Sequence, residues 1–247
     1  MSEDVRYDLI VIGAGPGGYV AAIRAAQLGM KVAVVEKRAA LGGVCLNEGC
    51  IPSKALLDSS ELFALARDRF ALHGIAIDPP QLDLATMQRR KDDVVKRLTD
   101  GVAYLFKKNG ITLVSGSAAL KGPDAEGLQE VAVKTVWQLP LPDNMNRLEA
   151  QDGAGITLLR GKRVLLATGS EAAALPATPF DGQVVVSARE ALSFDSVPEH
   201  LIIAGGGYIG LEIGSIWRRL GARVTVIEML PRLLPAMDQQ VADTLYR

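Results

Sequence analysis

The chain has 247 residues, 49% of them hydrophobic, with a formal net charge of -1 and two cysteines. That length suits one large or two ordinary domains with a packed core. The sequence has neither a basic stripe nor the strong excess of positive charge that is typical of nucleic-acid-binding proteins. No apolar run reaches the roughly 18 residues of a membrane helix. Residues 1–8 resemble neither a signal peptide nor a transit peptide. We therefore predict a cytoplasmic protein that binds neither nucleic acid nor membrane.

The chain begins with the pattern of a dinucleotide-binding unit. A strand is predicted over 7–12, a glycine-rich turn over 13–18, a helix ending near Gly29, and a strand over 32–35 closed by Glu36. The first glycine of such a turn permits a tight bend, the second lets the backbone approach a pyrophosphate, and the third lets helix and strand pack closely. The helix N-terminus offers N–H groups to the phosphates. The acidic residue accepts hydrogen bonds from the ribose hydroxyl groups.

Both cysteines follow this unit, as Cys45 and Cys50 in a Cys-x4-Cys spacing. A structural zinc site needs four ligands, and the two histidines, His73 and His200, lie far from the pair in sequence. A structural disulfide would close a short loop and add only about 2 kcal/mol. We predict a redox dithiol and no metal, with two inert buried thiols as the alternative.

Three further elements are predicted along the middle of the chain. Apolar residues at three- and four-residue spacing indicate an amphipathic helix over 83–109, and the basic runs at 89–91 and 107–108 are interpreted as its solvated face. Short antiparallel strands are predicted over 111–137 and an extended hairpin loop over 139–155. A strand over 163–166 follows, and a hinge between domains is expected after Ser170.

Residues 201–228 repeat the opening unit. Adding 192 to Gly13, Gly15, Gly18, Gly29 and Glu36 gives Gly205, Gly207, Gly210, Gly221 and Glu228. Both glycine-to-glutamate separations are 23 residues (36 − 13 and 228 − 205). One such glycine pattern is a weak signal, whereas two in register are a strong one.

Two dinucleotide sites in one chain predict two dinucleotides, a flavin and a nicotinamide, between which hydride passes. A carboxylate at Glu228 disfavours a ribose 2′-phosphate, so NAD is preferred over NADP. Pro52 suits the first turn of a helix that continues over 54–70. Cys50 then lies at a helix N-terminus, where the dipole stabilises a thiolate. We therefore expect Cys50 to face the flavin and Cys45 to be the exposed sulfur that exchanges with substrate.

Residues 45–57 read Cys-Leu-Asn-Glu-Gly-Cys-Ile-Pro-Ser-Lys-Ala-Leu-Leu. With the two glycine motifs, they resemble the pyridine nucleotide-disulfide oxidoreductase family over essentially the whole chain. Leu46 and Ile51 stand where glutathione and mercuric reductases tend to carry valine, so the dihydrolipoamide dehydrogenase branch is the most similar one. Val44 and Glu48 depart from the common family pattern.

The resemblance implies an α/β fold with two domains. The first, over 1–171, would be a Rossmann-like, three-layer ββα FAD-binding domain that carries the dithiol and a small antiparallel sheet. The second, over 172–247, would be an incomplete Rossmann-like NAD-binding domain, without the family's carboxy-terminal interface domain.

The resemblance also implies roles for individual residues. Lys54 would lie beside the reactive edge of the flavin and pair with Glu212, which makes the catalytic set Cys45, Cys50, Lys54 and Glu212. The implied FAD contacts are Gly13, Gly15, Gly18, Glu36, Lys37, Gly43, Lys54, Ala118, Ala167, Thr168 and Gly169. The implied NAD contacts are Gly205, Gly207, Gly210 and Glu228.

The implied activity is oxidation of dihydrolipoamide by NAD through the Cys45–Cys50 pair and FAD. Implied partners are the lipoyl domain of a 2-oxo acid dehydrogenase or glycine-cleavage complex and a second copy of the chain. Neither His73 nor His200 matches the family's His-Glu acid-base motif, so we expect a truncated form with negligible turnover alone. The alternatives are a non-catalytic FAD-binding or interaction module and a related disulfide reductase of the same family.

Overall fold

The computed structural model describes residues 5–135 and 155–246. Contacts divide the chain into two compact units, Met1–Asn47 with Val95–Glu171, and Glu48–Val94 with Ala172–Arg247. One border, after Glu171, coincides with the expected domain limit, and the second unit also includes 48–94. Compactness and domain ancestry are different properties, so the limits 1–171 and 172–247 stay a prediction.

A parallel sheet forms the centre of the first unit. Its strand order is β4-β3-β2-β8, where β2 is Leu9–Ile12, β3 is Val32–Glu36, β4 is Thr112–Ser115 and β8 is Val164–Leu166. Helix α1, Pro16–Gln27, connects β2 to β3 and contacts both. All five residues of β3 are buried, as expected for a strand covered on both faces.

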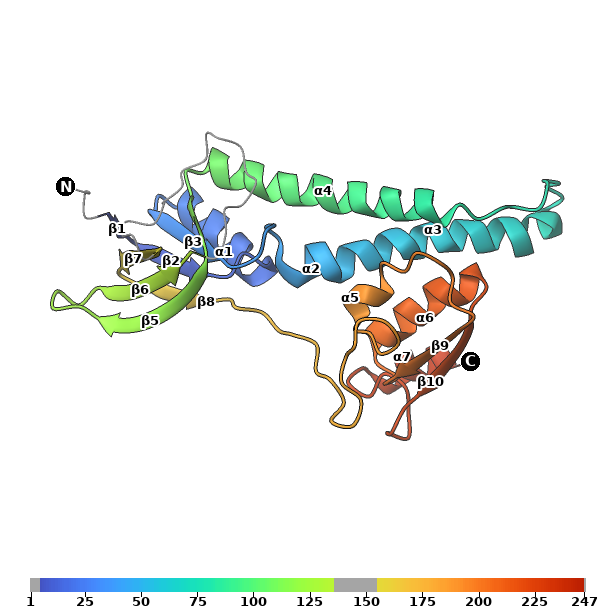
Figure 1. Cartoon of the computed structure of the whole chain (residues 1–247). Helices are drawn as coiled ribbons and strands as arrows, with labels where there is room; N and C mark the ends of the chain where they lie inside the picture. Colours follow the sequence, from blue (N-terminus) through green and yellow to red (C-terminus); the bar gives the residue numbers. More distant parts are fainter. Residues whose placement is uncertain (1–4, 136–154, 247) are drawn as a thin grey trace. The chain divides into compact units, whose positions relative to one another are not determined.

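A second sheet of the first unit has the order β1-β7-β6-β5 (Figure 1). Its strands are β1, Arg6–Tyr7; β5, Ser117–Pro123; β6, Gln129–Lys134; and β7, Ile156–Gly161. One hydrophobic core joins both sheets, with Ile10 and Val35 from the parallel sheet packed with Val131 and Leu159 from the second. With α1 on the parallel sheet, this is the predicted three-layer ββα arrangement.

Two strand predictions need correction. The segment 7–12 is not one strand, because β1 and β2 belong to different sheets on either side of Asp8, whose carboxylate accepts the Lys31 N–H at 2.9 Å. The prediction of antiparallel strands over 111–137 is confirmed for β5 and β6 but wrong for β4, which pairs in parallel with β3. The predicted loop over 139–155 lies, except for Gly155, outside the described residues.

The second unit contains the repeated βαβ element. Strands β9, His200–Ala204, and β10, Arg223–Ile227, are parallel and connected by α6, Tyr208–Leu220. Helix α3, Cys50–Asp68, packs on α6. The smaller elements are η1, Phe70–His73; α5, Ala188–Ala191; and α7, Gln239–Tyr246. Two helices, α2, Gly43–Glu48, and α4, Leu84–Lys108, cross the border between the units.

Trp217 is at the centre of the core of the second unit. Its side chain is fully buried among Leu56, Leu192 and Ile213. The indole Nε1–H donates a hydrogen bond of 2.9 Å to the carbonyl oxygen of Ala191, so the polar end of the ring is satisfied. This core holds α3, α5 and α6 together.

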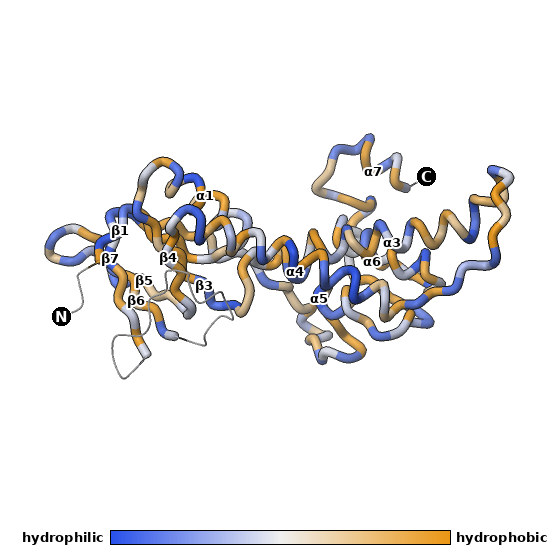
Figure 2. Tube along the Cα trace, turned by 90° about the horizontal axis from the view of Figure 1, so that it is seen from above, coloured by the Kyte–Doolittle hydropathy of each residue, from blue (hydrophilic) through white to orange (hydrophobic). Residues whose placement is uncertain are grey.

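The long helix agrees with its prediction, 83–109, within one residue at each end. It begins after Asp83, whose carboxylate accepts the Thr86 N–H at 2.9 Å, and ends before Gly110, which has a φ of 66°. Figure 2 shows hydrophilic and hydrophobic residues alternating along α4. None of the described helices is both long and apolar enough to cross a membrane.

The interpretation of residues 89–91 as a solvated face is wrong for Lys91, which is only 6% exposed. Its ammonium lies 3.3 Å from the carbonyl oxygen of Leu192, 3.3 Å from the Ser193 hydroxyl and 3.1 Å from the Asp92 carboxylate. These acceptors compensate the desolvation of the charge. Lys91 therefore attaches α4 to the end of α5, a contact that helical periodicity cannot reveal.

We expect Lys91→Ala to lower the free energy of unfolding by about 1–3 kcal/mol, because the acceptors at Leu192 and Ser193 lose their donor. The control is Lys96→Ala, which removes an exposed pair with Asp100 in the same helix and should cost only about 0.3–0.5 kcal/mol. Urea unfolding followed by circular dichroism measures both. Equal losses in the two variants would contradict the assigned role of Lys91.

Candidate functional site

The first glycine loop connects β2 to α1 by a backbone path that only glycine permits. Gly13 has a φ of 104°, a conformation that other residues rarely adopt. A Cβ on Gly18 would lie 1.8 Å from the carbonyl oxygen of Gly13. Gly15 is the N-cap of α1 and makes no side-chain capping bond. No side-chain oxygen therefore blocks the approach of an anion to this helix N-terminus, although Pro16 has no N–H and the Gly18 N–H donates to the carbonyl oxygen of Gly15 at 2.9 Å.

Glu36, at the end of β3, lies against this loop and is 5% exposed. Its Oε2 accepts the Ala14 N–H at 2.8 Å, and its Oε1 accepts the Arg38 N–H at 2.8 Å. Each carboxylate oxygen can accept more than one bond. Glu36 thus both fixes the glycine loop and keeps acceptor capacity for hydroxyl groups.

The second copy repeats the positive φ, the helix N-cap and the glutamate of the first. Gly205 also has a φ of 104°, and Gly207 is the N-cap of α6, again without a side-chain capping bond. Glu228 accepts the Leu230 N–H at 2.7 Å and the Gly206 N–H at 2.6 Å. These two bonds, that of Leu230 first, lower the pKa of Glu228 below its ordinary value.

The repeat extends further than the sequence shows. The Gly42 N–H donates to the carbonyl oxygen of Ala14 at 2.9 Å, and the Leu234 N–H donates to that of Gly206 at 2.9 Å. Both offsets are again 192 (234 − 42 and 206 − 14). Both donors have positive φ, 99° at Gly42 and 49° at Leu234. Comparing the two copies in sequence does not reveal the equivalence of Gly42 and Leu234, because the second copy has leucine at a position whose positive φ favours glycine.

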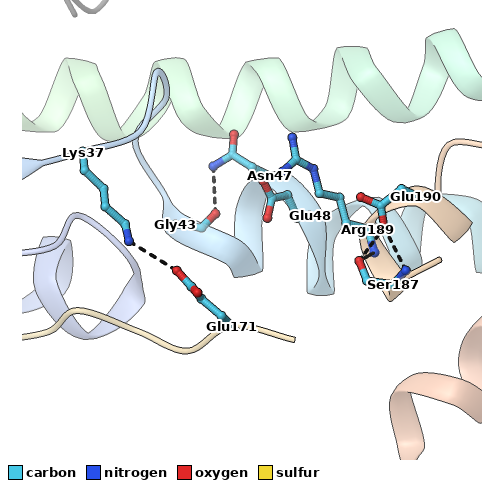
Figure 3. Close-up of polar contacts among 8 residues, drawn as sticks. All are labelled: Lys37, Gly43, Asn47, Glu48, Glu171, Ser187, Arg189 and Glu190. Carbon is cyan, nitrogen blue, oxygen red and sulfur yellow. Dashed lines mark hydrogen bonds and ion pairs between the residues drawn. The ribbon is translucent and has the colours of Figure 1, made fainter. Parts of the chain in front are cut away.

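The loop after β3 lies directly on the first glycine loop. A Cβ on Gly43 would be 2.6 Å from the Cα of Gly15, so a side chain at position 43 would push the two loops apart. Gly43 begins α2, and the side-chain amide of Asn47 donates to the carbonyl oxygens of Leu41, at 2.9 Å, and Gly43, at 2.8 Å (Figure 3). These bonds fix the short helix that carries Cys45.

Cys50 is the first residue of α3, with Gly49 as its N-cap, so it lies at the helix N-terminus as predicted. The helix begins two residues before Pro52, which occupies its first turn. Cys45 is half-buried in α2, an element that the sequence did not predict, and Cys50 is exposed. The prediction that Cys45 is the exposed sulfur of the pair is therefore wrong for this chain. The border between the two units passes between the cysteines. Their action as a redox pair stays a prediction.

The ion pair implied for Lys54 and Glu212 is present in the second unit. The two side chains meet at 2.5 Å and are 57% and 29% exposed. The Ser53 hydroxyl can donate to the second oxygen of Glu212, at 3.1 Å, or to the carbonyl oxygen of Cys50, at 3.2 Å. An exposed pair alone stabilises by only about 0–1 kcal/mol. The buried Ser53, missed by sequence reasoning, adds a second contact to Glu212.

Of the remaining residues predicted to contact FAD in the first unit, Ala167 lies at the first glycine loop. Ala167 follows β8, and its carbonyl oxygen is the nearest atom to a Cβ built on Gly13, so it lies at the first glycine loop. Thr168 and Gly169 follow it and are exposed. Lys37 extends toward Glu171, 3.4 Å away (Figure 3). Ala118 lies in β5, opposite Val133, and none of its described pairings connects it to the glycine loop.

Comparison with known proteins identifies the family of the chain. The model of the family described as pyridine nucleotide-disulphide oxidoreductase matches residues 7–247. The chain belongs to this family.

Two curated relatives show the extent of the similarity. Dihydrolipoyl dehydrogenase 3 of Pseudomonas aeruginosa is 50% identical over 98% of this chain and 47% of its own length. The mitochondrial dihydrolipoyl dehydrogenase 1 of Arabidopsis thaliana is 46% identical over 97% of this chain and 43% of its own length. The chain thus spans about half the length of the curated relatives it matches.

Solved structures share the fold. LpdA from Mycobacterium tuberculosis superposes with a TM-score of 0.80 at 24% identity, over 98% of this chain and 48% of that one. The HOCl-induced flavoprotein disulfide reductase RclA from Escherichia coli superposes with a TM-score of 0.71 at 25% identity, over 97% of this chain and 46% of that one.

Both glycine loops fit a bound dinucleotide. Each presents a helix N-terminus without a side-chain cap, formed by Gly15 in one copy and Gly207 in the other. Each also holds a glutamate, Glu36 or Glu228, by backbone N–H groups beside the loop. This donor and acceptor set matches a pyrophosphate and the ribose hydroxyls of a dinucleotide.

We expect Gly18→Ala to destabilise the first copy by more than about 3 kcal/mol, because the new Cβ meets a backbone oxygen that cannot move aside. Gly210→Ala should cost less, about 1–3 kcal/mol, since the new Cβ meets the Cγ2 methyl group of Ile203 at 2.7 Å and the carbonyl oxygen of Gly205 only at 3.0 Å. Hydrogen exchange of the α1 and α6 amides measures each copy separately. Gly101→Ala, with no neighbour within 4 Å in α4, should stabilise by about 0.5–1 kcal/mol.

Glu228 should make stability depend on pH at the acidic end. Its pKa is lowered in the folded state, so its contribution is present above the ordinary glutamate value of about 4.3 and is lost as pH falls through the folded-state pKa. The stability difference between the wild type and Glu228→Gln should therefore be constant from pH 7 to about 5 and shrink below about 4. Urea unfolding across this range tests it, and a constant difference down to low pH would disprove it.

Proposed function

We propose that this chain forms the flavin- and dithiol-bearing part of a dihydrolipoyl dehydrogenase, which oxidises a dihydrolipoyl group with NAD. Relatives of that name match 97–98% of the chain at 46–50% identity. The observation that carries the proposal is the Ser53–Glu212–Lys54 cluster. It connects α3, which begins at Cys50, to α6, which follows the second glycine loop.

The residues that would hold the two cofactors follow from the loops described above. FAD would be held by Gly13, Gly15, Gly18 and Glu36, with Lys37, Gly43, Lys54, Ala118, Ala167, Thr168 and Gly169 as further proposed contacts. NAD would be held by Gly205, Gly207, Gly210 and Glu228. The chemistry that FAD supplies when bound is acceptance of an electron pair from the dithiol and its transfer to NAD.

The cysteines would exchange with the substrate in two steps. A thiolate of the substrate attacks Sγ of Cys45 in the oxidised pair, forming a mixed disulfide while Cys50 leaves as a thiolate. The second substrate thiol then loses its proton and displaces Cys45, which leaves as a thiolate and takes up a proton. The substrate departs as a cyclic disulfide, and its two electrons remain in the reduced Cys45–Cys50 pair.

Position along α3 supports the assignment of roles. Cys50 is the first residue of α3, at the helix N-terminus. Lys54 is four residues further along the helix, so it shares a face with Cys50. Glu212 and Ser53 restrict where the Lys54 ammonium points.

The partners belong to the same proposal. The substrate dithiol would be carried by the lipoyl domain of a 2-oxo acid dehydrogenase or glycine-cleavage complex, and the full-length protein would act as a homodimer. A cytoplasmic location stays a prediction, and some relatives carry the word mitochondrial in their names.

The visible spectrum tests the proposal. The purified chain incubated with FAD should be yellow after removal of free flavin, and one equivalent of dithiothreitol should produce a long-wavelength band from a thiolate beside the flavin. Cys45→Ser should show a long-wavelength band without reductant, because the proposal places the free Cys50 sulfur beside the flavin, and Cys50→Ser should lack the band. A colourless chain, or a band that survives in Cys50→Ser, would refute the proposal.

A further inference from the structure

The loop 229–238, between β10 and α7 (Figure 1), contains an unusual backbone conformation. Among the residues that the structure describes, Leu234 in this loop alone combines a side chain with a positive φ, 49°. This conformation costs a leucine free energy that it does not cost a glycine. Leu234 is also only 5% exposed, so its side chain is packed in the protein. Contacts of the loop must therefore hold Leu234 in this conformation.

A side chain holds the same carbonyl group in both copies of the repeat. In the first copy the Asn47 amide donates to the carbonyl oxygen of Gly43 at 2.8 Å, and in the second the Arg232 guanidinium donates to that of Pro235 at 2.8 Å. The two carbonyls are 192 positions apart (235 − 43). The same guanidinium also binds the carbonyl oxygen two residues further along, at 3.2 Å. The turn that follows Leu234 is thus fixed from within its own loop.

Both polar backbone groups of Gly206 are bound. Its N–H donates to Oε2 of Glu228 at 2.6 Å, and its carbonyl oxygen accepts the Leu234 N–H at 2.9 Å. None of the described peptide bonds is cis, and in a planar trans peptide the C=O and the following N–H point in opposite directions. The bond from Leu234 therefore fixes the direction of the Gly207 N–H, which points away from the loop 229–238.

This N–H belongs to the helix N-terminus of the second glycine loop. Gly207 is the N-cap of α6, and its N–H is one of the donors that the helix offers to an anion. No hydrogen bond between described residues uses it. Its direction is therefore set at the other end of the same peptide unit, where the Gly206 carbonyl accepts the Leu234 N–H.

We propose that Leu234 is a positioning residue of the second glycine loop, which acts through the peptide bond between Gly206 and Gly207. Its N–H holds the Gly206 carbonyl so that the Gly207 N–H points at the pyrophosphate of the dinucleotide. The inference rests on the proposed function, which assigns NAD to this loop, and adds the loop 229–238 to the elements that serve NAD binding.

Two replacements that differ by one methyl group test the proposal. Leu234→Gly and Leu234→Ala both remove almost the whole buried side chain, but only glycine adopts a positive φ without cost. The isotope-labelled chain of 247 residues is titrated with ADP, and NMR follows the Gly207 amide. Following one amide separates this loop from the first glycine loop, which ADP can also occupy. Adenosine, which lacks the pyrophosphate, is the second ligand.

Leu234→Ala should bind ADP about fivefold more weakly than Leu234→Gly, because the alanine leaves the positive φ in most molecules and releases the Gly206 carbonyl. The two variants should bind adenosine equally. The matched control is Gly182→Ala, which imposes the same backbone cost at a φ of 74° in the second unit, where a Cβ has no neighbour within 4 Å. It should bind ADP as the wild type does.

A second measurement needs no variant. Coupling between two sites is reciprocal, so ADP should slow the hydrogen exchange of the Leu234 N–H about fivefold more than adenosine does. Fluorescence of the buried Trp217 reports whether each variant keeps the fold of the second unit.

Equal ADP affinities of Leu234→Gly and Leu234→Ala would overturn the proposal, because the residue would then act through its side chain alone. An equal loss of affinity for adenosine would also overturn it, as would a Leu234 exchange rate or a wild-type Gly207 amide that does not respond to ADP. These measurements need neither flavin nor the cysteines. Failure of this inference is therefore distinguishable from failure of the proposed function, which the visible spectrum decides.

Discussion

Among the described glycines of the first unit, Gly18 in the first turn of α1 leaves the least room for a side chain. A Cβ at position 18 would lie 1.8 Å from the Gly13 oxygen, so the helix can leave the sheet in this direction only with glycine there. The direction of α1 in turn leaves its N-terminal N–H groups without side-chain partners. Glu36 and the loop at Gly43 then pack against the same turn, which makes this contact the origin of the site.

Besides the hydrophobic core around Trp217, several polar contacts attach α3 to α6. The exposed Lys54–Glu212 pair contributes about 0–1 kcal/mol by itself. Ser53 adds a bond from a buried hydroxyl. Further along both helices, Arg67 donates to the carbonyl oxygen of Arg219 at 2.9 Å, and Arg219 donates to that of Leu57 at 3.3 Å. The helix that begins at Cys50 is thereby fixed along its length to the element that follows the second glycine loop.

Sequence alone predicted the two βαβ units, the helix over 83–109 and the position of Cys50, because periodicity, glycine spacing and helix-start signals are local. It missed what depends on partners far along the chain. The parallel pairing of β4, the burial of Lys91 and the hydroxyl of Ser53 each involve a residue more than 70 positions away. The sequence did not reveal Leu234 for a different reason. Its φ and its backbone hydrogen bond correspond to those of Gly42, whereas its residue type differs.

The pairing of β2 has a consequence for synthesis on the ribosome. One neighbour, β3, follows soon after, whereas Ile10 pairs with Val164 in β8, 154 residues later (164 − 10). At about 5–20 residues per second, β2 keeps one open edge for roughly 8 to 30 s. Ala167, which lies against Gly13, is made later still. The nascent chain must therefore protect an apolar strand edge throughout this interval, and the first glycine loop is completed only when the last strand of its sheet arrives.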